Sequence, residues 1–203
     1  MPRKHRHTSQ QSSILAIRSK GLVSDLRLVN FRVSNEQKTF HSPEVEKLTD
    51  KARELRISGD ASAAEKLYRQ ALDLEPIQPD LLNNLAASLL LQGRKREAQS
   101  LTETIYLLFP DYLFARTSLA SDAIREGNLE LAADLLEPLF KRRDFHSSEF
   151  DSLCIAQIEL LAMSGELSSA IDWLKMWEDC NPKHPSLDFY RRLLQQNTTI
   201  KSG

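Results

Sequence analysis

The chain has 203 residues, of which 41% are hydrophobic and 27% charged, a composition typical of a globular protein with one sizeable domain and a tail. No stretch of the sequence approaches the roughly 18 consecutive apolar residues that a membrane-spanning helix needs, so we expect no transmembrane segment. Two cysteines, Cys154 and Cys180, suggest neither a disulfide framework nor a thiolate metal site, so no cofactor or metal is expected.

The first 41 residues differ in charge from the rest. They hold eight Lys and Arg against two acidic residues, a net charge of +6, whereas residues 42–203 carry −7. We expect a flexible N-terminal arm over residues 1–41, because its first part is polar and basic. Partial alternation from Val23 to Val33 permits a short strand, which must dock on another element to be stable.

Three roles for this arm stay open. Its charge could bind an acidic surface, including nucleic acid. It could fold back onto the acidic body, or it could be an organelle-targeting leader, since it holds no acid before Asp25. The absence of a secretory signal pattern and the two cysteines favour a cytoplasmic location, with organelle targeting as the alternative.

A repeated pattern follows between residues 42 and 182. Four glycines are separated by 34, 34 and 38 residues, and an alanine stands five positions after each of them. A proline stands seventeen positions after three of the four. The glycines are Gly59, Gly93, Gly127 and Gly165, the alanines Ala64, Ala98, Ala132 and Ala170, and the prolines Pro76, Pro110 and Pro182.

Each glycine lies between two runs with helical spacing of apolar residues. There it supplies the left-handed backbone angle that ends one helix before the next begins. Two of the following residues, Asp60 and Asn128, can cap the second helix. The alanine permits close approach of two helices, and the proline ends the second helix. Each period therefore predicts two antiparallel helices joined by a tight turn.

This pattern resembles the tetratricopeptide repeat, whose 34-residue unit it matches in length and marker positions. The resemblance implies an all-α fold, a right-handed α-solenoid of about four helix-turn-helix repeats beginning at residues 45, 79, 113 and 151. Residues 42–182 would form the repeats, residues 183–196 a C-terminal capping helix and residues 197–203 a tail.

Two irregularities and three side chains complete the fold prediction. Pro138 falls inside the second helix of the third repeat and should bend or shorten it. Four extra residues near RRDFHSSEF predict a longer loop or helix, with Ser147 or Ser148 as cap. We expect Trp173 and Trp177, which are four residues apart on one helix face, to pack in the core against the capping helix. We expect Cys154 to be an unreactive thiol in the core.

The resemblance also implies a concave groove, lined by the first helix of each repeat, that binds a peptide or helix of another protein. We therefore expect a non-enzymatic adaptor or scaffold. The same residues could instead pack against neighbouring helices. The predicted groove residues are Arg53, Arg56, Asn83, Asn84, Ala87, Leu90, Leu91, Thr117, Ser121, Ile124, Arg125, Glu159 and Met163.

The sequence also bears on functions other than that of an adaptor. The family's carboxylate clamp for an acidic chaperone tail corresponds to five positions here, of which only Asn84 matches, so we expect no such binding. No phosphate loop, nucleophile elbow or zinc-protease motif suggests catalysis. The alternatives kept are a nucleic-acid-associated protein that contacts phosphates through the basic arm, and a homo-oligomer.

Overall fold

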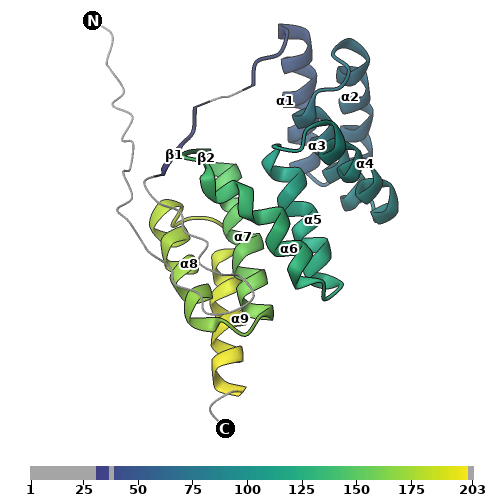
Figure 1. The fold of residues 1–203 in the computed structure, drawn as a ribbon. Helices are drawn as coiled ribbons and strands as arrows, with labels where there is room; N and C mark the ends of the chain where they lie inside the picture. The colour runs from purple at the N-terminus through teal and green to yellow at the C-terminus, as the bar shows by residue number, and fades with distance from the viewer. Residues whose placement is uncertain (1–30, 37–38, 201–203) are drawn as a thin grey trace, which may run out of the picture. The chain divides into compact units, whose positions relative to one another are not determined.

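The computed structural model describes residues 31–36 and 39–200, with side chains as far as residue 196 (Figure 1). They form nine α-helices, one short 3-10 helix and two three-residue strands, and the predicted all-α class is confirmed. The chain divides into two compact units: the N-unit, residues 37–119, and the C-unit, residues 1–36 with 120–203. Most of the predicted flexible arm, residues 1–30, lies outside the described residues, so its flexibility stays a prediction.

The N-unit is built from antiparallel helical hairpins. It contains α1 (Pro43–Ile57), α2 (Ala61–Leu74), α3 (Pro79–Leu91), α4 (Lys95–Leu108) and the first part of α5 (Leu113–Arg125). Helix α1 packs against α2, α2 against α3 and α3 against α4. Their core includes Ala52, Tyr68, Leu85 and Leu89, which come from three different helices, so neither hairpin buries its apolar face alone.

The four predicted turn glycines all have positive φ, between 78° and 93°. At each turn, the residue after the glycine donates its N–H to a carbonyl five residues earlier. In the second repeat, for example, Arg94 donates to Leu89 at 3.0 Å and Gly93 donates to Leu90 at 3.0 Å. This pair of hydrogen bonds is the Schellman motif, which satisfies carbonyls that the helix end leaves free. The predicted helix-turn-helix geometry is therefore confirmed.

The other repeated markers act as expected. The side chains of Asp60 and Asn128 cap α2 and α6 (Leu129–Leu136) by accepting from backbone N–H groups three residues on. Each repeat proline directly follows the C-cap residue of a second helix. All four marker alanines are buried, with at most 6% of their surface exposed. Small side chains there allow close helix packing.

The C-unit contains the end of α5, then α6, a 3-10 helix (Glu137–Lys141), α7 (Ser147–Met163), α8 (Leu167–Cys180) and α9 (Leu187–Ile200). Helix α6 stops after eight residues and tightens into the 3-10 helix at Pro138, so the predicted shortening is confirmed. Helix α7 packs on α8 and α8 on α9.

The segment RRDFHSSEF contains strand β2 (Asp144–His146), which the sequence analysis did not predict. It pairs in parallel with β1 (Arg32–Ser34), so the end of the predicted N-terminal strand docks within the C-unit. The cap of α7 is His146 rather than Ser147 or Ser148. The reason is geometric, since the strand holds His146 in an extended conformation and the Glu149 side chain accepts from its N–H at 2.8 Å, closing a capping box.

The last helix, α9, covers α8 as the predicted capping helix should. Trp173 and Trp177 are fully buried, which confirms their predicted core role. The Trp177 indole donates to Asp151 at 2.7 Å, and its ring lies 5.8 Å from that of Tyr190 on α9. Cys154 is also fully buried, and burial raises the pKa of its thiol well above the usual value. The predicted inert core thiol fits this environment.

Candidate functional site

The predicted groove residues of the N-unit lie on α1, α3 and α5. Leu90 and Leu91 end α3 and are 53% and 62% exposed. Asn83, Asn84 and Ala87, on the same helix, are half-buried, as is Arg56 on α1. Arg53 is exposed and pairs with Asp50 at 2.7 Å.

One predicted groove residue of the N-unit is not available to a partner. Thr117 is only 2% exposed, and its hydroxyl donates to the carbonyl of Leu113 at 3.1 Å. The prediction that Thr117 lines a groove is therefore wrong.

The exposed apolar side chains of α1 and α3 lie at one end of the N-unit. Helices α1 and α3 run in the same direction, because each packs antiparallel to α2. Their C-terminal ends, and with them Ile57, Leu90 and Leu91, therefore point to the same end. Ile57 is 77% exposed. We call these three residues the turn-end leucine and isoleucine set.

In the C-unit the structure brings two predicted residues together and adds a third. Ser121 donates to Glu159 at 3.0 Å, and the hydroxyl of Tyr190 donates to the other oxygen of Glu159 at 2.7 Å. Burial, followed by the charge of Glu159, raises the pKa of Tyr190. This network joins α5, α7 and α9. Nothing in the local sequence around Tyr190 indicates this pairing with Glu159.

The remaining predicted residues of the C-unit differ in exposure. Ile124 is 5% exposed, so the prediction that it lines a groove is wrong: its side chain belongs to the packed interior. Arg125 is exposed and pairs with Asp122 on its own helix. Met163 is 61% exposed at the end of α7.

A buried carboxylate stiffens the N-unit beneath the candidate surface. Glu65 on α2 is 8% exposed. It accepts hydrogen bonds from Arg69, Arg94 and Gln92, and the shortest donor–acceptor distance to each of them is 2.8 Å. Burial opposes its ionisation, but these hydrogen bonds outweigh burial and lower the pKa of Glu65 to about 2. Gln92 and Arg94 belong to the turn after α3, so the carboxylate fixes that turn against α2.

A second polar cluster holds the residues before α1. The two ring nitrogens of His41 lie 2.7 Å from Glu75 and 2.7 Å from Asp80, and the N–H of Ser42 donates to Glu75 at 2.8 Å. Both ring nitrogens face carboxylate oxygens, so both must carry protons to donate. Burial opposes the charged ring, but the hydrogen bonds to Asp80 and Glu75 outweigh it and raise the pKa of His41.

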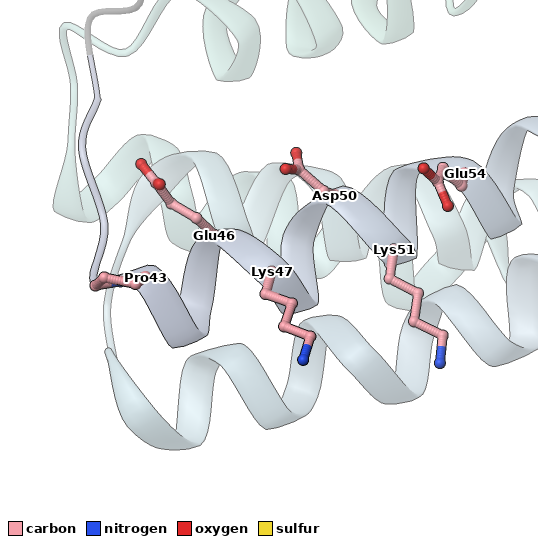
Figure 2. A pocket seen from close by; sticks show the side chains of 6 residues that line it. All are labelled: Pro43, Glu46, Lys47, Asp50, Lys51 and Glu54. Atoms are coloured by element: carbon pink, nitrogen blue, oxygen red, sulfur yellow. The ribbon is translucent and has the colours of Figure 1, made fainter.

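Helix α1 also carries a shallow recess of about 520 Å³ on its exposed face (Figure 2). Figure 2 shows three acidic side chains directed to one side of the helix and two lysines to the other. Mixed charges at helical spacing are typical of a solvated face, so the recess supplies no chemistry specific to a ligand. Its lining is Pro43, Glu46, Lys47, Asp50, Lys51 and Glu54.

Within residues 31–36 and 39–200, no three His, Cys, Asp or Glu side chains are grouped so that they could hold a metal ion. No helix in the same ranges is long and apolar enough to cross a membrane. The exposed leucines Leu90 and Leu91 end α3, and the turn that follows them is held against α2 by the Glu65 cluster.

Comparison with known proteins agrees with this geometry. Residues 55–121, about a third of the chain, match the tetratricopeptide repeat family. This part of the chain is therefore a tetratricopeptide repeat segment. No curated protein matches it. The matched range contains the turns at Gly59 and Gly93, where the tetratricopeptide markers are most regular.

Three solved structures are similar to the chain to different degrees. A putative kinesin light chain with nearly identical tetratricopeptide-like repeats from Podosopora anserina is 18% identical, with a TM-score of 0.52 over 81% of this chain and 90% of that one. MamA from Desulfovibrio magneticus is 12% identical, with a TM-score of 0.45 over 79% and 97%. The Sgt2 repeat domain from Aspergillus fumigatus is 18% identical, with a TM-score of 0.35 over 82% and 85%. At 18% identity, the likeness to the kinesin light chain repeats concerns the fold alone.

Proposed function

We propose that this tetratricopeptide repeat protein is a non-enzymatic scaffold that binds an amphipathic helix or extended apolar segment of another protein at the turn-end leucine and isoleucine set. Tetratricopeptide folds commonly serve as protein-interaction scaffolds. The observation that carries the proposal is the pair Leu90 and Leu91, more than half exposed at the end of α3. Neighbouring exposed leucines on a rigid helix are typical of a surface that receives an apolar partner.

The surroundings of this set support the same function. The half-buried Asn83 and Asn84 on α3 can fix the orientation of a bound segment by hydrogen bonding, as polar groups in peptide-binding surfaces do. The Glu65 cluster holds the turn after Leu91 in place, so little conformational entropy is lost when a partner binds.

The alternative based on nucleic acid stays a prediction. Apart from Arg32, the basic residues of the arm lie outside the described residues. Arg32 pairs with Asp144 at 2.9 Å. Homo-oligomerisation and the cytoplasmic location also stay predictions.

The experiment compares two double variants of the intact protein. Leu90→Glu with Leu91→Glu places charge on the proposed surface. Leu107→Glu with Leu108→Glu places the same charge on leucines that end α4 and are also more than half exposed. Proteins retained by the wild type from an extract are purified and their affinities measured directly. Each leucine contributes about 1.5 to 3 kcal/mol when fully buried, so the first variant should bind at least about tenfold more weakly.

The control variant should bind like the wild type. Equal affinity of both variants would contradict the proposal, provided that far-ultraviolet circular dichroism shows unchanged helix content. Weaker binding by the control alone would move the binding surface to the end of α4, which also contradicts it.

A further inference from the structure

The short sheet of the C-unit joins segments that are far apart in the sequence. Strand β1 pairs with β2 in parallel, with Arg32 opposite Asp144, Val33 opposite Phe145 and Ser34 opposite His146. Three residue pairs are too few to hold two strands together in water. The docking of β1 therefore depends on its side chains.

Phe31 provides the main side-chain contact. Its ring stacks on that of Phe150 with 5.1 Å between centroids and meets the edge of Phe145 at 6.2 Å. Phe145 and Phe150 are fully buried, and Phe31 is 6% exposed. Phe145 lies on β2 and Phe150 in the first turn of α7, so these two rings form an aromatic cradle that receives a third ring from the arm. Such ring pairs stabilise beyond the area they bury.

Polar contacts on either side define the direction and register of the docked strand. The N–H of Arg32 donates to the carbonyl of Arg143 at 2.7 Å, and the Arg32 guanidinium pairs with Asp144 at 2.9 Å. At the other end, the hydroxyl of Ser147 donates to the side-chain oxygen of Asn35. An extended segment with an aromatic residue, a basic residue next to it and a polar residue four positions on from the aromatic fits this arrangement.

This is the contact pattern of strand addition, in which main-chain hydrogen bonds give affinity and side-chain pockets give specificity. Two features make the docked segment replaceable. The pair between Arg32 and Asp144 is more than half exposed on both side chains, so it stabilises little. The next helix along the chain, α1, belongs to the N-unit, so β1 does not continue into a helix of the C-unit.

We propose that β2 and the cradle of Phe145 and Phe150 form a peptide-binding site, which residues 31–35 of the chain fill as an internal ligand. The site takes extended segments of the type aromatic, basic, aliphatic, small polar, amide. A partner segment with this chemistry competes with the arm for the cradle. This site is separate from the turn-end leucine and isoleucine set, and it goes beyond the scaffold function proposed above.

The test uses the full chain and a fluorescent peptide with the sequence of residues 31–36, FRVSNE. In the variant Phe31→Ala the arm loses its anchor and the cradle is vacant, so the peptide should bind saturably by fluorescence anisotropy. The wild type should bind at least about tenfold more weakly, because an occupied site lowers apparent affinity by the fraction of protein with the site free. A peptide with alanine in place of the phenylalanine should not bind either protein.

A second variant leaves the aromatic core untouched. Arg32→Pro removes the N–H that donates to Arg143 and the guanidinium that pairs with Asp144, so it should also open the site to the peptide. Equal binding to the wild type and to both arm variants, or binding to none, would overturn the proposal.

Discussion

The turn at Gly93 allows a quantitative test of how the repeat is built. Gly93 has φ of 78°, and a Cβ atom added there would meet nothing within 4 Å. The cost of Gly93→Ala should therefore come from the backbone alone. A left-handed backbone conformation costs an L-residue about 1 to 2 kcal/mol. The unfolded chain has less conformational entropy with alanine than with glycine, which offsets part of this cost. We expect a net loss of about 1 kcal/mol in the free energy of unfolding.

The comparison with Gly93→Asn separates this cause from others. Asparagine tolerates left-handed angles better than alanine, so its cost should be smaller, about half a kcal/mol or less. Urea unfolding followed by circular dichroism at 222 nm measures both, with Gln99→Ala on the exposed face of α4 as control. Equal losses for alanine and asparagine, or no loss for alanine, would refute the argument that the backbone angle determines the residue.

Three further predictions concern other strained or charged positions. Ile77 has a φ of 64° and is 60% exposed. Because asparagine adopts left-handed backbone angles more readily than isoleucine, Ile77→Asn should raise the free energy of unfolding, measured with urea, by about 0.5 to 1 kcal/mol. A lower free energy of unfolding would show that the side-chain contacts of Ile77 outweigh the strain. The pKa of Glu65 is lowered to about 2, so the contribution of its charge to stability is complete above pH 4.5 and is lost as the pH falls through the folded value. In the wild type the urea midpoint should therefore decrease between pH 5 and 3, and Glu65→Ala should make this decrease smaller. An equal decrease in both proteins would contradict this. The pKa of His41 is raised above 6.5, so the contribution of its charge to stability is complete below pH 6.5 and is lost as the pH rises through the folded value. His41→Asn should remove this contribution to the decrease of the urea midpoint between pH 6 and 9. An equal decrease in both proteins would disprove it.

The parts of the fold that depend on local backbone geometry were predictable from the sequence. A glycine before Asp60 or Asn128 specifies a turn and a cap within four residues, and the structure has both. Pro138 ends α6 because proline lacks the N–H that an α-helix needs. Each of these signals acts over less than two helical turns, so no knowledge of neighbouring helices was needed.

The parts that depend on distant partners were not predictable. Phe31 and Phe150 are 119 positions apart, and nothing in either local sequence indicates the other. The family rule for groove positions placed Ile124 and Leu90 on the same surface, yet Ile124 is buried and Leu90 exposed. Exposure at equivalent positions differs because it depends on which side chains the neighbouring helices contribute.

The Glu65 cluster restricts how the N-unit can evolve. Glu65 belongs to the first repeat, whereas Gln92 and Arg94 belong to the second. The surfaces at which these two repeats meet are therefore complementary in charge as well as in shape. If the second repeat were exchanged for one without these donors, the carboxylate would keep only its hydrogen bonds from Arg69 on α2, and the loss of its other partners is destabilising for a buried charge. Duplication or shuffling of single repeats is therefore disfavoured here, and the first two repeats should be inherited as a pair.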